Sequence, residues 1–372
     1  MKKESLHLKY LDYRNFCEVK DFKEYKKGKL RENSLYVVIP PEKNNLTLPV
    51  FTPQEKIHLP NFCSTNEIYL ASIKDGLCLK NQVIIYDNKY ILPDSFRHYQ
   101  YISPHKGLRF NEVSNKFTTK ERISETNYQP GDSIFLSGEI SQGYGHFLLE
   151  VVSRLWITQY MDISRYKFIM NPNDNKRWQL DILKSLGISK KQILFLNEPI
   201  RCERLHIPVQ AFVLRKYTSS YAYNIWTKIG EYYNRSVGPK KIYVSRSKLN
   251  NKRRQLVNEK EVEKIFASFG FRIVHPQELS VGQQINLFKN ANIIAGPSGS
   301  GMYNSVFQRK SRRKLVLTTR NFVKMSDILI NTSTSGQLNY FFGETIENHK
   351  SIHEAKWRIN IYKLRKFLKC YL

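Results

Sequence analysis

The residues best suited to bind a ligand form a glycine-rich turn, residues 296–301, with the sequence Gly-Pro-Ser-Gly-Ser-Gly. The turn follows the apolar run 292–295 and precedes residues 302–307, which can begin a helix. Between a strand and a helix, small residues let a phosphate approach backbone N–H groups, and the helix dipole favours its negative charge. The turn therefore predicts a phosphate site, although such turns also serve as plain chain reversals.

Two arginines can neutralise such a phosphate. Arg246 follows the predicted strand 241–245, and its planar guanidinium can hold two phosphate oxygens at once, as a lysine cannot. Arg254 lies in the charge run 252–254, a pattern equally typical of a solvated surface. Because ligands bind beyond the carboxyl ends of strands in open parallel sheets, we expect Arg246 and the turn 296–301 to face one pocket.

The elements around these residues alternate strands with helices. Asn258 with Glu261, and Ser280 with Gln283, resemble capping boxes that open two helices. Such alternation implies parallel strands with right-handed crossovers. The predicted strands are 241–245, 271–275, 292–295 and 314–318, and the predicted helices are 259–269 and a second one that ends at residue 291.

The first part of the chain is β-rich, and it carries no motif that we assign to chemistry. The runs 82–86 and 89–92, joined by Asp87 and Asn88, predict a hairpin. From residue 133 the pattern changes to alternating strands and helices. The predicted strands in this region are 134–136, 167–170, 192–196 and 205–209, with helices over 145–156, 177–186 and 220–233.

These patterns predict an α/β protein with two Rossmann-like, doubly wound domains and a β-rich N-terminal lead-in. We expect residues 1–235 to form the first domain, with the lead-in over 1–130 and the Rossmann-like part over 131–235. Residues 236–345 would form the second domain, and residues 346–372 a basic amphipathic C-terminal helix.

The chain has 372 residues and a formal net charge of +28, which favours anionic partners: nucleic acid, an acidic membrane face or phosphorylated substrates. No apolar run approaches the roughly 18 residues needed to cross a bilayer, and the N-terminus lacks a signal peptide, so we expect a cytoplasmic protein. The five cysteines are scattered and predict reduced thiols. Because no two aspartates stand two positions apart, protein groups would have to neutralise a bound diphosphate.

An ordered set of spaced residues resembles the pattern of glycosyltransferase family 61, which contains plant xylosyl- and animal N-acetylglucosaminyltransferases and many bacterial capsule or lipopolysaccharide enzymes. The resemblance covers roughly residues 140–310, and an ordered set of positions is more specific than one glycine turn. The residues that carry it are 144–150, 154–155, 241–246, 254, 258–259, 270–271, 276, 278–280, 284–285, 287–288, 291 and 296–307. Two departures are Ser298, where the family commonly has histidine, and Phe147, where it often has tryptophan.

The resemblance implies a GT-B fold and inverting transfer of a sugar from a nucleotide-sugar donor to a glycan or lipid-linked glycan acceptor, without a metal or other cofactor. The enzyme would be a hexosyl-, pentosyl- or N-acetylhexosaminyltransferase of surface polysaccharide synthesis. The donor diphosphate would bind Arg246, Arg254 and the turn with the helix after it, and Glu278 and Gln284 would help to hold the nucleoside. Gln284 is equally an ordinary polar residue near a helix start. The turn and helix residues concerned are Ser298, Gly299, Ser300, Gly301 and Asn304.

An inverting transferase needs a base that takes the proton of the acceptor hydroxyl. His146 follows a glycine-flanked tyrosine at the start of a predicted helix, and Glu150 lies one turn later on the same face. Either residue could be the base while the other orients it. A structural histidine at the helix start is the alternative for His146.

The C-terminal segment places Trp357, Ile361, Leu364 and Leu368 at helical spacing among cations. Such a helix could lie on an anionic membrane surface, which would make the protein peripheral on the inner membrane face. Alternatively, it packs across the first domain.

Two other functions are open to this sequence. The charge of +28 with 13% aromatic residues suits a nucleic-acid or polyanion-binding protein, but the chain has no RNA-recognition aromatic motif, no zinc-ligand spacing and no concentrated basic stripe. We therefore expect no nucleic-acid partner. A catalytically inactive family member that binds nucleotide without transfer is the other alternative.

Overall fold

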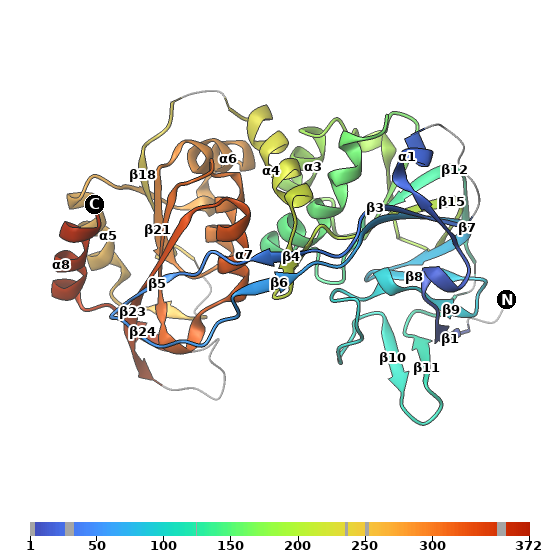
Figure 1. The fold of residues 1–372 in the computed structure, drawn as a ribbon, viewed down its shortest axis with the longest axis horizontal. Coiled ribbons are helices and arrows are strands. Elements are labelled where there is room, and N and C mark those ends of the chain that lie inside the picture. The colour runs from blue at the N-terminus through green and yellow to red at the C-terminus, as the bar shows by residue number, and fades with distance from the viewer. Residues whose placement is uncertain (1–3, 27–32, 124, 235–236, 250–252, 348–354) are drawn as a thin grey trace. The chain divides into compact units, whose positions relative to one another are not determined.

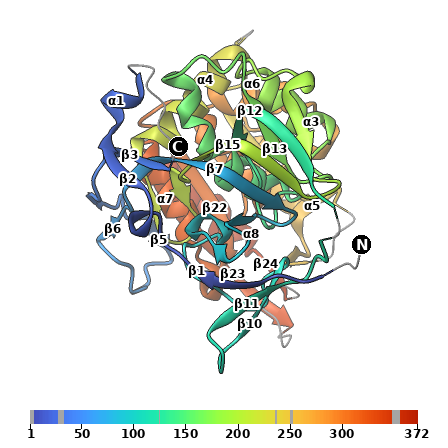
Figure 2. The ribbon, with the colours of Figure 1, turned by 90° about the vertical axis from the view of Figure 1, so that its right-hand side faces the viewer.

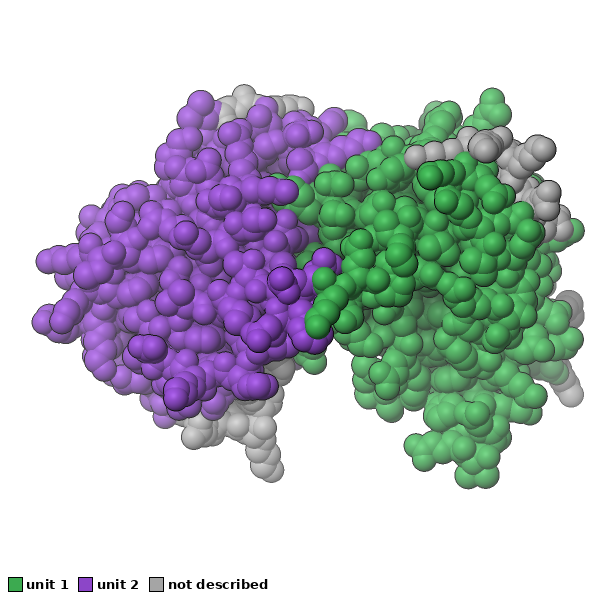
Figure 3. Space-filling model, viewed as in Figure 1, with its two compact units in different colours: residues 1–43, 64–225 green, residues 44–63, 226–372 purple. Residues whose placement is uncertain are grey.

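The computed structural model describes residues 4–26, 33–123, 125–234, 237–249, 253–347 and 355–372. The chain divides into two compact units, coloured separately in Figure 3. Unit 1 comprises residues 1–43 and 64–225, and unit 2 comprises residues 44–63 and 226–372. The boundary predicted between residues 235 and 236 lies outside the described residues. The expected mixed α/β class is confirmed.

Unit 1 is built on a large mixed sheet whose central path runs β10-β11-β1-β9-β8-β7-β15-β12-β13-β14. The predicted hairpin is present, because β8 and β9 pair antiparallel and both Asp87 and Asn88 have positive φ. The strands of this sheet outside its parallel part are β1 (His7–Tyr10), β2 (Glu18–Asp21), β3 (Ser34–Ile39), β7 (Ile68–Leu79), β8 (Val83–Tyr86), β9 (Tyr90–Ile91), β10 (Leu108–Asn111) and β11 (Lys116–Thr119), and α1 (Phe22–Lys26) follows β2.

The parallel part of this sheet is the predicted strand–helix series, and Figure 2 shows its strands β15, β12 and β13 side by side with β7. From β12 the chain passes through a helix to β13, through α3 to β14, and then back to β15 on the other side of β12. The strand order therefore reverses between β12 and β15. The elements are β12 (Asn127–Phe135), β13 (Lys167–Met170), α3 (Arg177–Lys184), β14 (Ile193–Phe195), β15 (Ile200–Pro208), the short pair β16 (Phe212–Val213) and β17 (Tyr217–Thr218), and α4 (Ser220–Tyr232).

Unit 2 contains a second parallel sheet, whose strands stand in the order β23-β22-β21-β18-β20. In chain order these strands are fifth, fourth, third, first and second, so the winding direction reverses between β18 and β21. Figure 1 shows α5 and α8 on one side of this sheet and α6 and α7 on the other. The elements are β18 (Lys241–Val244), α5 (Glu259–Ser268), β20 (Arg272–Val274), α6 (Val281–Asn290), β21 (Ile293–Pro297), the 3-10 helix η7 (Ser300–Phe307), β22 (Arg313–Thr319), α7 (Met325–Ser333) and β23 (Gln337–Glu347).

Segments distant in sequence extend this second sheet. Strand β5 (Val50–Thr52), from the residues inserted between two parts of unit 1, pairs parallel with β23. On its antiparallel side, β23 pairs with β24 (Lys356–Arg358), which in turn pairs with β19 (Gln255–Leu256). The remaining strands, β4 (Lys43–Asn45) and β6 (Phe62–Ser64), pair with each other.

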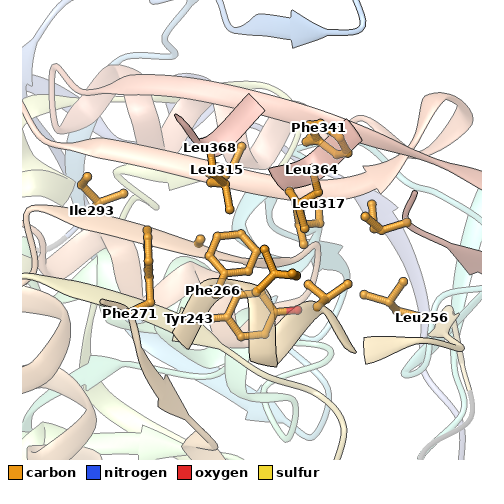
Figure 4. Close-up of a cluster of buried hydrophobic side chains, with 14 of the residues drawn as sticks. Tyr243, Leu256, Phe266, Phe271, Ile293, Leu315, Leu317, Phe341, Leu364 and Leu368 are labelled. Carbon is orange, nitrogen blue, oxygen red and sulfur yellow. The ribbon is translucent and has the colours of Figure 1, made fainter. Parts of the chain in front are cut away.

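The C-terminal helix differs from our expectation. Helix α8 (Ile361–Tyr371) begins only after Asn360, whose side chain accepts a hydrogen bond from the N–H of Lys363, and Trp357 lies in β24 instead. Leu364 and Leu368 are fully buried in the core of unit 2 with residues of α5 and the sheet (Figure 4). The apolar face of α8 is therefore covered within unit 2 and is not available to a membrane surface.

The two predicted capping boxes have different outcomes. Ser280 and Gln283 form the expected reciprocal hydrogen bonds at the start of α6. The box predicted for Asn258 and Glu261 is wrong, because the Asn258 amide bonds both the N–H and the carbonyl of Ile359 and no longer reaches the helix backbone. Asn258 thereby joins the start of α5 to the segment that precedes α8.

Candidate functional site

Arg246 and the glycine-rich turn meet in unit 2, as expected. The guanidinium Nη1 of Arg246 donates a hydrogen bond to the carbonyl of Ser298 at 3.1 Å. The two groups follow β18 and β21, the neighbouring strands between which the winding direction reverses, and such a switch point is where doubly wound sheets bind ligands. Gly296 allows this approach, since a Cβ at that position would lie 2.6 Å from the carbonyl oxygen of Val244.

Arg254 lies beside Arg246 in the same part of unit 2. Its guanidinium carbon lies 4.8 Å from the centre of the Phe322 ring, and its Nε is buried without a hydrogen-bond partner. The hydroxyl of Ser298 is likewise buried without a partner. Both residues line a pocket whose other lining residues are Thr318, Thr319, Phe322, Ala355 and Trp357. The pocket thus contains polar groups that a ligand can satisfy.

The charges at and beside this pocket, those of Arg254 and Arg246, favour an anion. Burial, followed by the charge of Arg246, lowers the pKa of Arg254 to about 10, so both guanidinium groups remain protonated at neutral pH. Arg246 also donates to the carbonyl of Arg253 at 3.0 Å, which keeps its side chain directed along the turn. An anion bound between the two arginines would offset their mutual repulsion.

Glu259 holds the backbone that carries Arg246. Its carboxylate accepts a hydrogen bond from the N–H of Arg246 at 2.7 Å and lies 3.4 Å from the hydroxyls of Tyr243 and Ser245. Its position in the first turn of α5 also lets the carboxylate stabilise the helix dipole. Burial raises the pKa of Glu259 to about 7, so the buried carboxyl is only partly ionised at neutral pH.

Replacing Glu259 by glutamine is expected to flatten the pH dependence of stability between pH 5 and 7. Because the folded-state pKa lies above the ordinary value of 4.5, the stabilisation by this carboxyl is full at low pH and decreases as the pH rises towards 7. The loss in the wild-type protein between pH 5 and 7 is about 2 kcal/mol. Urea unfolding at pH 5, 6 and 7 measures this pH dependence of the free energy of unfolding. Glu261→Gln, an exposed change on the same helix, should keep the wild-type slope, and an unchanged slope in Glu259→Gln would refute the assignment.

A second group of polar side chains lies in unit 1, after the carboxyl end of β12. The helix there begins as α2 (Tyr144–His146), widens into a π-helical turn, η3 (Phe147–Val151), and tightens into the 3-10 helix η4 (Val152–Gln159). Such widened turns are frequent at functional sites. His146 Nδ1 lies 2.8 Å from Glu150 Oε2, and Gly143 keeps the ring unobstructed, because a Cβ there would lie 3.3 Å from His146 Cδ2.

Arg97 completes this group from the β-rich part of the chain. Its guanidinium donates to both carboxylate oxygens of Glu150, with Nη2 at 2.9 Å and 3.2 Å. Burial would raise the pKa of Glu150, but the hydrogen bond from His146 and the charge of Arg97 outweigh it and lower the pKa. Glu150 is therefore ionised and can accept a hydrogen bond from an N–H at His146 Nδ1, an arrangement that would leave Nε2 free to act as a base.

The remaining predicted site residues have structural partners. Glu278 is exposed and pairs with Lys248 at 2.8 Å. Gln284 accepts a hydrogen bond from the Asn304 amide and donates to the carbonyl of Pro276, so it connects α6, η7 and the turn before α6. Gly299 packs against Arg246, and Ser300 and Gly301 begin η7. Among the described residues, no group of three or more His, Cys, Asp or Glu is placed to hold a metal ion.

Sequence reasoning missed several residues of these two sites. Thr318 and Thr319 end β22, so the rule that placed Arg246 at a carboxyl end would have found them. Phe322 lies in the short helix directly after the same strand. Trp357 and Arg97 carry no comparable signal, because each reaches its site through strand pairings or loops distant in sequence.

The family model described as Glycosyltransferase 61 matches residues 144–315 of this chain. The match begins at the helix that carries His146 and Glu150 and extends past η7 into β22. It confirms the family resemblance found in the sequence. No curated protein matches the chain.

Proposed function

Because residues 144–315 belong to the glycosyltransferase 61 family, we propose that this protein is an inverting transferase that moves a sugar from a nucleotide-sugar donor to a glycan in surface polysaccharide synthesis. The observation that carries the proposal is the hydrogen bond between Arg246 and the glycine-rich turn at the switch point of the unit 2 sheet. A two-domain GT-B arrangement, with the donor on unit 2 and the acceptor-activating residues on unit 1, is part of the proposal.

The donor diphosphate would bind at the pocket lined by Arg254 and Ser298, beside Arg246. The N–H of Ser298 is bonded to the carbonyl of Leu317, so the turn would offer the Ser298 hydroxyl and the N–H groups at the start of η7. Gln284 and Asn304 would hold these elements in place rather than contact the phosphates. The two arginines would neutralise the leaving diphosphate, which is why we propose a reaction without a metal.

Acceptor activation would use the imidazole of His146. Its Nε2 would take the proton of the acceptor hydroxyl as the hydroxyl oxygen bonds the anomeric carbon and the bond from that carbon to the diphosphate breaks. Glu150, held by Arg97, would stabilise the imidazolium that forms, and single displacement at the anomeric carbon inverts its configuration. The 2.8 Å contact between His146 and Glu150 thus favours an active enzyme over an inactive nucleotide-binding member.

The subcellular location of the protein is also a proposal. No helix within the described residues is long and apolar enough to span a membrane. The exposed residues of α8 include Lys363, Arg365, Lys366 and Lys369, so attachment to an anionic membrane face would rest on this basic surface alone. We propose a cytoplasmic enzyme that reaches lipid-linked acceptors in this way.

A panel of nucleotide sugars tests the proposed function. We expect one of the UDP-, GDP- or CMP-sugars to raise the melting temperature, and at a hundred times its dissociation constant a ligand adds about 2.7 kcal/mol of stability. The same ligand should be hydrolysed slowly to the free nucleotide when no acceptor is present. Stabilisation by duplex DNA, with no response to any nucleotide sugar, would instead support a polyanion-binding protein.

A further inference from the structure

The turn between β16 and β17 in unit 1 presents two adjacent cations, Arg215 and Lys216. Both side chains are exposed. No carboxylate of the described residues forms an ion pair with either of them. Arg215 has a φ of 67°, a conformation that favours glycine, so the chain accepts local strain to present an arginine at this position. Two adjacent exposed cations that form no ion pair with a carboxylate of the described residues suit a surface that binds an anion.

This turn is held beside the proposed base. Strand β16 packs against the π-helical turn η3, and Ser153 donates to the carbonyl of Phe212 at 3.5 Å. The Nζ of Lys216 donates to the carbonyl of His98 at 2.7 Å, and the adjacent Arg97 binds Glu150 and lies 3.2 Å from His146 Nδ1. Lys216 is therefore connected to His146 through the adjacent residues His98 and Arg97.

The sheet explains why these segments meet. The helix with His146 follows the carboxyl end of β12, and the segment with Arg215 and Lys216 follows the carboxyl end of β15. These two strands are parallel neighbours, and the winding direction of unit 1 reverses between them. The carboxyl ends at a reversal are where open sheets bind ligands.

The balance of charge at this position is positive. Burial lowers the pKa of His98, and the charges of Arg97, Lys216 and Arg215 act in the same direction, while Glu150 opposes them. Since Glu150 is paired with Arg97, the charges of Arg215 and Lys216 are not offset within the group. The Nδ1 of His98 is also buried without a partner. A neutral glycan would leave the two exposed cations without a counter-charge.

We propose that the acceptor of this enzyme is an anionic glycan and that Arg215 and Lys216 bind its carboxylate or phosphate groups. This inference rests on the proposed transferase function and names the chemical class of its acceptor. The exposed cations would bind the charged group through charge-assisted hydrogen bonds. His146 would then meet a hydroxyl of the same or the adjacent sugar.

Binding of charged and neutral saccharides to the full chain tests the proposal. The probes are a hyaluronan hexasaccharide, which carries carboxylates, N-acetylglucosamine 1-phosphate, which carries a phosphate, and neutral chitohexaose. We expect the wild-type protein to bind at least one charged probe more tightly than chitohexaose. The double variant Arg215→Ala/Lys216→Ala should weaken binding of that probe about ten-fold or more, without changing that of chitohexaose. The charged probe whose binding is weakened in the double variant shows whether the two cations recognise a carboxylate or a phosphate.

The control removes the same charge from another part of unit 1. Lys190 and Lys191 are exposed and precede the amino end of β14, at the edge of the sheet away from His146. Lys190→Ala/Lys191→Ala should retain wild-type affinity for the charged probe. Equal weakening in both double variants, or equal wild-type affinity for charged and neutral probes, would overturn the proposal. Thermal stabilisation by nucleotide sugars is measured on the same samples. If the nucleotide sugar still stabilises the protein when one of these two contrary results is found, only the anionic acceptor is overturned. If no nucleotide sugar stabilises the wild-type protein or either double variant, the transferase function is overturned.

Discussion

Arg246→Ala is expected to abolish the thermal stabilisation by nucleotide sugars and to lower kcat/KM by about 10²- to 10³-fold. The guanidinium lies against the glycine-rich turn, and it would supply the bidentate contact to the diphosphate. It would also act more strongly on the departing diphosphate than on the bound donor, because negative charge develops there during the reaction. Thermal unfolding with and without the nucleotide sugar measures the loss of stabilisation. Steady-state kinetics with varied donor concentration measure the fall in kcat/KM.

Matched variants separate this role from a structural one. Arg246→Ala also removes hydrogen bonds to the carbonyls of Ser298 and Arg253, so its ligand response is compared with its own melting temperature without ligand. Arg246→Lys keeps the charge but loses the fork geometry, and we expect intermediate binding. Arg272→Ala, an exposed change at the start of β20, should behave as the wild-type protein. Full stabilisation of Arg246→Ala by the donor would refute the assignment.

His146→Ala is expected to retain donor binding while turnover falls by about 10²- to 10⁴-fold. The imidazole is oriented by Glu150 through the 2.8 Å contact, and only its Nε2 would take part in proton transfer. Removing the ring would leave the arginine pocket of unit 2 unchanged, since the two sites are built from different segments. Initial rates at saturating donor measure the loss of turnover. Thermal stabilisation by the nucleotide sugar, measured in parallel, shows that donor binding is retained.

Glu150→Gln completes this test. The glutamine carbonyl can still accept a hydrogen bond from His146 Nδ1–H but cannot stabilise an imidazolium by charge, so kcat should fall while KM for the donor stays the same. His7→Ala, which changes an exposed histidine of β1, is the control and should leave turnover unchanged. Wild-type turnover in His146→Ala would remove this residue from the mechanism and direct attention to Glu150 as the base.

Much of the fold could be predicted because it follows from local patterns. The strands at 167–170 and the helix that begins at residue 177 coincide with β13 and α3, since apolar periodicity depends only on neighbouring residues. The box of Ser280 and Gln283 formed for the same reason. The box of Asn258 did not, because a partner about a hundred positions later competed for its amide.

The sequence by itself determined the order of strands and helices, the carboxyl-end position of Arg246 and of the glycine-rich turn, and the pairing of His146 with Glu150 one helical turn later. Only the tertiary structure decided which distant groups join them. Strand pairing and core burial brought Arg97 to Glu150, Glu259 to the N–H of Arg246, and α8 to the core of unit 2. These contacts depend on free energy gained when segments far apart in the chain pack together, and no local pattern records which segments those are.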